Sequence, residues 1–582
     1  MAKASSSGVG RGSFRQAQAW LHTWCGLWLS WLLFAVFLTG TLAVFEEPIT
    51  HWMTPEHHAE EAAAHNVAPT GTTVDSAADA TADMAQRLAW GLAYMEKHHP
   101  GAPMWELWPA DAQGAGNLTV YWFNPQGGYA EARLDPATGA PLGKAPRTAR
   151  DTLGGHHFVD FHYRLHAGQV GLWIVGIAAV VMLVALVSGV ITHRRIFQDF
   201  FTFRPRKGQR SWLDAHNATG VLTLPFQLMI VYTGIAVSGV HFMPAGVVAF
   251  FGPGIQGVKT YQSAQSAPDK PPRSGQAMAV PDLAPLVQRG QQLIGQPVRA
   301  VVIDYPGDAH ARIGVYGWNE EGSMLRRLST SSGMAQFSAA TGELLSVRLP
   351  GEVEGGGASL AKEVIGSLHT LKYGGWALKW LYFLCGLAGS AMIATGAMLF
   401  VVKRRSKHLG EFGAATARVY GLIEGLNVAA IAGLPLACVG YLWANRLVPV
   451  ALAHRHDWEL VAFFGLWLLA LVHALCRVPA RAWAEQLAAL AALCLLLPLL
   501  NWLTVGDHWL AQFQREDWES LGVELVALAC GGLALRAGWA LRQGARLRPG
   551  ASAALSPAAK SVASATSVNS ATSTTARAKE AV

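Results

Sequence analysis

The chain has 582 residues, of which 51% are hydrophobic and only 14% are charged. Soluble domains carry roughly 25% charged residues, so this deficit predicts a membrane protein. The formal net charge of +7 does not require nucleic acid as a partner, because basic loops between membrane spans account for it.

Eight apolar runs are long enough to cross a bilayer, which takes about 20 helical residues. Lys and Arg gather on one side of these runs: six lie between Arg194 and Arg210, and others follow the fourth, sixth and eighth runs. The positive-inside rule makes this side cytoplasmic and predicts a bacterial inner-membrane protein with both termini in the cytoplasm. The runs cover residues 20–45, 168–193, 217–240, 376–402, 419–444, 458–476, 483–503 and 521–541.

The predicted fold class is a polytopic α-helical membrane protein of about eight transmembrane helices with two α+β domains on the outer side. The tail is rich in Ala, Ser and Thr, and we expect it to be disordered. The expected segments are an N-terminus 1–19, a first span 20–45, an outer domain 46–160, two spans with a basic loop 161–240, a second outer domain 241–367, a fourth span 368–408, a four-span extension 409–548 and a tail 549–582.

The first four spans contain an internal repeat. His22-Thr-Trp-Cys-Gly26 in the first span corresponds to His216-Asn-Ala-Thr-Gly220 in the third, and a Thr-Gly pair follows each histidine by 17 and 18 residues. The second and fourth spans correspond more loosely, through Leu165-His166 and Leu368-His369. These two spans also share a small-residue pair, Ser188-Gly189 and Thr395-Gly396.

The two outer domains repeat in the same way. Each has a helical stretch, at about 80–97 and 281–293, followed by a strand-like segment, at 118–123 and 311–318. Each then reaches an Ala-Thr-Gly sequence, which ends at Gly139 and Gly342. The unit of helix, α+β domain and helix therefore occurs twice.

A parallel duplication predicts a pseudo-twofold axis along the membrane normal. His22 and His216 are then symmetry mates near the cytoplasmic face, and His166 and His369 are mates near the periplasmic face. A haem iron takes two axial ligands, which in a helix bundle come from facing helices. The pairs therefore predict two haem groups, with haem iron held by these histidines.

The second span has more histidines than two haems need. His162 lies one turn before His166, so it could ligate in its place, bind a haem propionate or contact the substrate. His193 is 27 residues beyond His166, about 40 Å along a helix, and competes with His22 and His216 for the inner iron. The glycines expected to let a haem ring approach the backbone are Gly26, Gly168, Gly171, Gly220 and Gly374.

Several motifs resemble the PepSY-associated transmembrane helix family, the iron-regulated membrane proteins that include bacterial ferric-siderophore reductases. The resemblance covers about residues 15–408 and leaves the four-span extension outside. One position departs from the pattern: Gln227 stands where many relatives have histidine. The motifs are Trp20-Leu-His22-x3-Gly26, Phe161-His-Tyr-Arg-Leu-His166, Ser188-Gly-Val-Ile-Thr-His193-Arg-Arg-Ile-Phe, Phe200-Phe-Thr-Phe-Arg-Pro205, Trp212-Leu-Asp-Ala-His216 and Leu368-His369.

The resemblance implies b-type haem in the bundle, PepSY-like outer domains and reduction of periplasmic iron held by a siderophore. We therefore expect an oxidoreductase whose partners are a ferric-siderophore or another Fe(III) complex, a cytoplasmic electron donor and the lipid bilayer. The donor could be an external reduced flavin. The positive charges of the basic loop could attract an anionic flavin or dinucleotide, although topology already explains them; these residues are Arg204, Arg206, Lys207 and Arg210. No catalytic residue is assigned.

Two other functions fit the sequence. The repeat could form a path for iron or a siderophore in a permease component, although the spans show no clear pair of broken helices of the kind that transporters use. Alternatively, the chain could be a non-catalytic PepSY scaffold or regulator.

Overall fold

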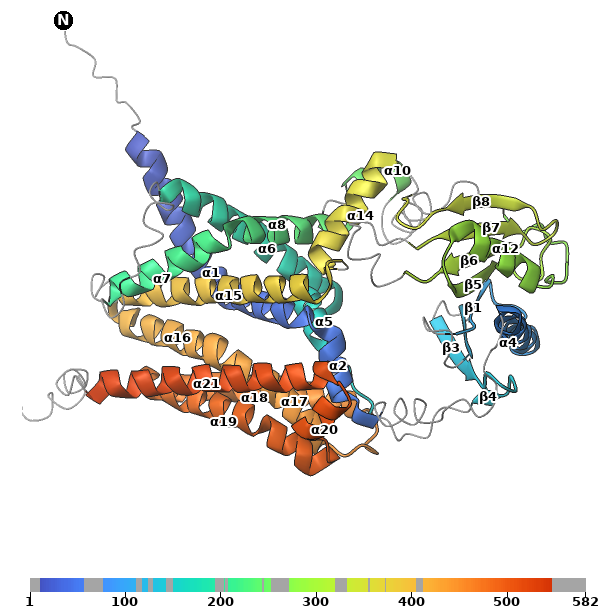
Figure 1. Ribbon diagram of the computed structural model, residues 1–582. Helices are drawn as coiled ribbons and strands as arrows, with labels where there is room; N and C mark the ends of the chain where they lie inside the picture. The colour runs from blue at the N-terminus through green and yellow to red at the C-terminus, as the bar shows by residue number, and fades with distance from the viewer. Residues whose placement is uncertain are drawn as a thin grey trace, which may run out of the picture.

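The protein, seen in a computed structural model, has three parts: a helix bundle with the repeat, a C-terminal helical extension and a β-sheet domain beside one end of the bundle (Figure 1). The tail 549–582 and most of the basic loop 194–207 lie outside the described residues. The structure describes residues 11–56, 77–110, 118–123, 129–142, 150–193, 204, 208–242, 245–252, 272–319, 332–353, 356–371, 373–404 and 412–546.

In the bundle, α1 packs against α6 and α15, α15 packs against α7, and α6 packs against α8. Large apolar side chains such as Trp28, Ile177 and Leu384 are more than half exposed, with values of 68%, 60% and 59%. Such a surface suits contact with lipid. The bundle helices are α1 (Arg11–Ala43), α5 (His156–Arg164), α6 (Gly168–Thr192), α7 (Gln209–Leu222), α8 (Leu224–Val237), α14 (Gly356–Thr370) and α15 (Gly375–Arg404).

Among the described residues, seven helices are long and apolar enough to cross a membrane, and the pair α7 and α8 makes an eighth span if it counts as one. We expected this third span to be a single run over 217–240, but it bends by 66° between Leu222 and Leu224. Pro225 explains the break, because proline has no N–H and its ring clashes with the carbonyl four residues earlier. The structure thus shows one bent span, whereas the sequence argument against a permease concerns a pair of broken helices.

The extension contains α16 and α17, which a π-helical segment joins into one span, followed by α18, α19 and α21. Asn427 of α16 connects it to the bundle: its side-chain oxygen accepts from Trp31 Nε1 of α1 at 2.8 Å, and its nitrogen donates to the Ala397 carbonyl of α15 at 3.5 Å. The elements are η1 (Gly413–Ala415), α16 (Thr416–Val428), η2 (Ala429–Gly433), α17 (Leu434–Leu447), α18 (Arg455–Cys476), α19 (Pro479–Val505), α20 (Trp509–Gln514) and α21 (Trp518–Arg546).

Both outer domains contribute to one antiparallel sheet of eight strands, in the order β4-β3-β2-β1-β5-β6-β7-β8. The first strand of each repeat meets its mate at the centre, where Glu106 pairs with Val302 and Leu107 with Val301. The strands are β1 (Met104–Trp108), β2 (Leu118–Phe123), β3 (Tyr129–Leu134), β4 (Pro141–Leu142), β5 (Val298–Asp304), β6 (Arg312–Gly317), β7 (Met334–Ser338) and β8 (Leu344–Arg348).

The sequence did not predict this fusion of two domains into one sheet. A twofold axis between equivalent strands makes them run antiparallel, and the pairing leaves neither first strand as an open edge. Helices α4 (Ala77–His98) and α12 (Ala284–Ile294) bury Leu88, Met95 and Val287 against the sheet, in one core with Leu107 and Val315. The remaining short helices are α2 (Glu46–Met53), α9 (Gly239–Phe242) and α10 (Ala245–Phe251).

Candidate functional site

Four histidines of the bundle form two facing pairs. The imidazole rings of His22 on α1 and His216 on α7 have centroids 6.2 Å apart. The rings of His162 on α5 and His369 on α14 have centroids 6.1 Å apart. Helix α7 lies at the end of the bundle remote from the sheet domain, and α5 and α14 lie at the end near it (Figure 1). We call the first pair the far-side pair and the second the sheet-side pair.

Each of these rings is held by a hydrogen bond from Nδ1 to a main-chain carbonyl. The distances are 2.8 Å from His22 to Ala185, 2.8 Å from His162 to Val36, 2.8 Å from His216 to Met392 and 3.1 Å from His369 to Ile230. Because a carbonyl only accepts, Nδ1 must carry the proton, and Nε2 keeps its lone pair. Metal-binding histidines are commonly oriented in this way.

Each ring also lies directly on a glycine of a neighbouring helix. A β-carbon added to Gly189 would lie 3.0 Å from Cε1 of His22, and one added to Gly396 would lie 3.1 Å from Cε1 of His216. We call these glycines seats. The sheet-side seats are closer, since a β-carbon at Gly40 would lie 2.5 Å from His162, and one at Gly234 would lie 2.8 Å from His369.

The seat and the carbonyl belong to one local motif. In all four cases the accepting carbonyl comes four residues before the seat glycine, and a Ser or Thr directly precedes the glycine. The hydroxyl of Thr39, for example, donates to the Val36 carbonyl at 3.3 Å, and that of Ser188 donates to the Ala185 carbonyl at 3.1 Å. The structure thus repeats the same histidine-binding surface four times.

The two pairs lie at different depths in the bundle. On α1, His22 is separated by 18 residues from Gly40, the seat of His162. At 1.5 Å per residue, this places the two levels about 27 Å apart along the helix. The hydrocarbon core of a bilayer is about 30 Å thick, so the separation of the two pairs is close to one bilayer thickness.

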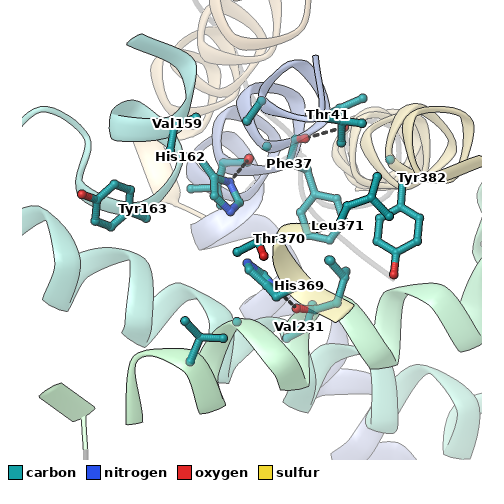
Figure 2. A pocket seen from close by; sticks show the side chains of 18 of the residues that line it. Phe37, Thr41, Val159, His162, Tyr163, Val231, His369, Thr370, Leu371 and Tyr382 are labelled. Atoms are coloured by element: carbon teal, nitrogen blue, oxygen red, sulfur yellow. Dashed lines mark hydrogen bonds between the residues drawn. The ribbon is translucent and has the colours of Figure 1, made fainter. Parts of the chain in front are cut away.

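A cavity of about 1110 Å³ opens around the sheet-side pair. Figure 2 shows His162 and His369 pointing toward one another, with Phe37, Val231 and Tyr382 among the side chains around them. Its wall is mostly apolar and includes Met182, Phe226, Ile230 and Phe242, and Glu46, Glu47, Asn319 and Lys379 also line it. An apolar cavity with a few convergent polar groups is typical of a cofactor site.

The donor set fits haem. Two imidazole–metal bonds of about 2 Å each, plus half of each ring, span roughly 6 Å, which matches the centroid separations. Within the described residues, no group of three or more His, Cys, Asp or Glu side chains is arranged to hold a metal ion. A pair of histidines suits a metal that brings its other ligands with it, as haem iron does.

The expected pairing of His166 with His369 is wrong, since the structure places His162 there instead. The ring of His166 contacts Asp160 through Nδ1 at 2.9 Å and His157 through Nε2 at 2.9 Å. It stacks on His157 with centroids 4.9 Å apart. Residues 165 to 167 separate α5 from α6 and turn His166 away, so the shared helical face that we assumed does not exist.

The other candidates take different places. His193 ends α6, where its N–H donates to the carbonyl of Gly189 at 3.0 Å, one turn beyond the seat of His22. The glycines expected to let a haem ring approach the backbone differ in what surrounds them within the protein. An added β-carbon would meet Met392 at Gly220, the Arg164 carbonyl at Gly171 and Leu378 at Gly374, and would meet nothing within 4 Å at Gly26 and Gly168.

Two further positions of the sequence analysis are visible. Gln227 of α8 is fully buried between the two levels, where its Nε2 donates to Thr223 Oγ1 and its Oε1 has no partner in the described part of the chain. Arg204 makes a bidentate ion pair with Asp214 at 3.0 and 3.2 Å. Arg206 and Lys207 lie outside the described residues.

A duplicated unit of helix, sheet and helix in a multi-pass bundle defines a membrane protein whose sheet domain lies outside the bundle. The sequence matches the PepSY-associated TM region over residues 19–403, and the chain belongs to this family. A relative, the uncharacterized protein PA4219 of Pseudomonas aeruginosa, is 27% identical over 397 residues, which are 66% of this chain and 93% of that protein. The family match ends before α16, so the whole extension lies beyond it.

Proposed function

We propose that the protein binds two b-type haems and transfers electrons across the bacterial inner membrane to ferric iron in the periplasm. The substrate class is a ferric-siderophore or another Fe(III) complex, and the electrons come from the cytoplasmic side. Reduction converts Fe(III) to Fe(II) with one electron, and the softer, less charged ion binds less tightly to hard oxygen ligands.

One observation carries the proposal: there are two pairs of histidines, the two rings of each pair face each other, and the two pairs lie about one bilayer thickness apart. Haem would supply a reversible one-electron carrier at each level. The residues of this chain fix the tautomer of each ring, hold it against a glycine and surround the sheet-side pair with an apolar wall.

The charge distribution supports the direction. The far-side pair lies at the end of the bundle with the Lys- and Arg-rich segments, which the positive-inside rule assigns to the cytoplasm. The sheet domain and the sheet-side cavity then face the periplasm. In this orientation, a cytoplasmic donor such as a reduced flavin meets the far-side pair, and the iron complex meets the sheet-side pair.

Proteoliposomes test this function. Vesicles that contain the protein enclose a reduced electron carrier as the donor. A ferric hydroxamate chelate is added outside, and the Fe(II) that forms outside is measured with a colorimetric chelator. The full chain should contain two haems and should form Fe(II) only when donor is present, while His162→Ala should abolish Fe(II) formation. A haem-free protein from iron-replete cells would overturn the proposal.

The same vesicles separate the two alternatives. Iron that enters the lumen without any donor would indicate a permease component, for which the broken span of α7 and α8 is the one supporting observation. A scaffold role predicts that alanine at His22, His162, His216 and His369 together leaves iron-limited growth of the host unchanged.

A further inference from the structure

The extension has a cluster of buried polar side chains at its end near the sheet domain. The cluster draws on α17, α18, α19 and α21, and each member is at most 6% exposed. Charged groups inside a membrane protein are costly and are kept for a purpose. The members are Asn445, Arg446, Arg455, Glu459, Asn501 and Glu524.

These side chains satisfy one another. Glu459 accepts hydrogen bonds from Arg455 and from Asn445. Glu524 accepts from Asn501 at 2.8 Å, and Asn501 in turn accepts from Arg446 at 2.8 Å. A buried network whose members are paired is rigid, so it can hold a neighbouring segment in one position.

The cluster contacts α2, which lies next to the bundle. The Trp52 indole donates to Glu524 at 3.1 Å, and the Arg446 guanidinium lies over its ring at 3.8 Å and donates to its main-chain carbonyl. Asp517, directly before α21, adds a hydrogen bond to His51 Nε2 of α2 at 3.1 Å. Trp52 is 1% exposed, so this contact is a buried joint between the two parts of the protein.

The cluster also holds the segment that leads into α5. Arg150 donates to the carbonyl of Asn445 at 2.7 Å, and the hydroxyl of Thr152 donates to Glu459. The phenol of Tyr441 donates to the carbonyl of Gly154 at 3.0 Å. The extension therefore makes three hydrogen bonds with the segment 150–154, at every second residue.

The start of α5 has no room to move between α2 and the extension. Gly154 has a φ of +57°, and a β-carbon on it would lie 2.6 Å from Thr50 Oγ1 of α2, while a β-carbon on Gly155 would overlap the carbonyl of Glu46 in α2. The Gly155 N–H donates to Thr50 Oγ1 at 2.9 Å. Glycine is needed at both positions, so the chain has one path into α5.

The first turn of α5 is buried against the extension. The His157 ring lies 4.4 Å from the Tyr441 ring and 4.4 Å from the Phe463 ring, centroid to centroid, and is fully buried. His162 follows five residues later in the same nine-residue helix. A helix this short moves as a unit, so its first turn sets the position of His162.

We propose that the extension positions His162, through Tyr441 and Glu459, so that its ring faces His369. Tyr441 and Glu459 are positioning residues, since neither touches the histidine pair. The extension lies outside the family match, yet in this proposal it positions a histidine of the bundle that the match covers. The effect on haem rests on the proposed function, but the effect on α5 does not.

Three variants of the full chain test the proposal. Tyr441→Phe removes the bond to Gly154, and Glu459→Gln weakens the bonds to Thr152 and Arg455. Trp443→Phe is the matched control, because its indole bond to the Leu493 carbonyl at 3.0 Å lies wholly within the extension.

The first measurement is hydrogen–deuterium exchange of the peptide covering residues 156–166, which needs no haem. We expect Tyr441→Phe and Glu459→Gln to exchange roughly three- to tenfold faster than the wild type, as the loss of one hydrogen bond allows, and Trp443→Phe to exchange at the wild-type rate. Unchanged exchange in both variants, or equal acceleration in the control, would overturn the proposal.

The second measurement is the EPR spectrum and midpoint potential of each haem, assigned with His162→Ala and His22→Ala. The sheet-side signal should shift in Tyr441→Phe and Glu459→Gln while the far-side signal stays constant, and the control should change neither. A joint change of both signals would overturn the proposal. A wild-type protein without haem would refute the proposed function alone, and exchange would then decide about the extension.

Discussion

Gly40 of α1 and His162 of α5 are in such close contact that a β-carbon on the glycine would lie 2.5 Å from Nδ1 of the ring. The same Nδ1 donates to the Val36 carbonyl one turn earlier on α1. The glycine and the carbonyl therefore fix both the height and the rotation of the ring. Each of the other three histidines has an equivalent seat, so the same contact between a histidine ring and a glycine occurs four times in the bundle.

Alanine at Gly40 should displace His162 and weaken the sheet-side haem. Overpacking of this kind costs about 1–3 kcal/mol, enough to lower haem occupancy several-fold. The measurement is the haem content of the purified protein by the pyridine haemochrome assay, with one haem expected in place of two. Gly465→Ala in α18 of the extension is the control, since its β-carbon would meet nothing within 4 Å. Two haems in Gly40→Ala would contradict the prediction.

Alanine at Gly189 should have a milder effect on the far-side pair. A β-carbon there would lie 3.0 Å from Cε1 of His22, so the ring must give by only a few tenths of an ångström. We expect both haems to remain bound while the EPR signal of the far-side haem shifts. Complete loss of a haem from Gly189→Ala, with Gly40→Ala unaffected, would show that the contact distances do not rank the seats.

Two histidines of the second span should behave differently when replaced by alanine. His162→Ala removes the partner of His369 and should leave a single haem. His166→Ala removes contacts to Asp160, His157 and two phenylalanine rings but none to either histidine pair, so two haems should remain. The ratio of haem to protein distinguishes these outcomes. The loss of one haem from His166→Ala, and not from His162→Ala, would restore the pairing first inferred from the sequence.

The far-side pair could be predicted because its motif repeats without change. His22 and His216 have the same spacing to Gly26 and Gly220, and each is followed by Thr-Gly. The spans were also predictable, since their apolar runs dominate the local sequence. The break at Thr223 inside the third run was missed, although Pro225 signals it.

The prediction that His166 pairs with His369 is wrong because it aligns the second and fourth spans on their Leu-His dipeptides. Alignment on the seat glycines corrects this: Gly189 lies 27 residues after His162, and Gly396 lies 27 residues after His369. The count includes the break between the short and the long helix of each repeat, which hydropathy does not reveal. The Ser/Thr-Gly pairs were seen as markers of the repeat, but not as contacts.

Contacts between distant segments could not be predicted from one sequence. The pairing of β1 with β5 joins residues about 200 positions apart, and the bond from Tyr441 to Gly154 spans 287. Neither strand periodicity nor composition names the partner of a segment in such cases. The buried Arg and Glu of the extension likewise look, in sequence, like the ends of spans.

The burial of His157 leads to a prediction for acid stability. This residue of α5 lies outside the membrane spans, and burial, together with the neighbouring His166, lowers its pKa from 6.5 to about 3. An unfolded chain binds a proton at this position near pH 6.5, whereas the folded protein does not. Stability is therefore full above pH 6.5 and is lost as the pH falls toward 3.

Below pH 6.5, the wild-type protein should lose up to about 1.4 kcal/mol of unfolding free energy per pH unit through this residue. His157→Phe keeps an aromatic ring between Tyr441 and Phe463 but cannot bind a proton, so its stability should fall less between pH 7 and pH 5. The measurement is the thermal unfolding midpoint of both proteins in detergent at matched pH values. Parallel pH profiles would mean that His157 is protonated in the folded protein, and that its ring does not stay buried between the bundle and the extension.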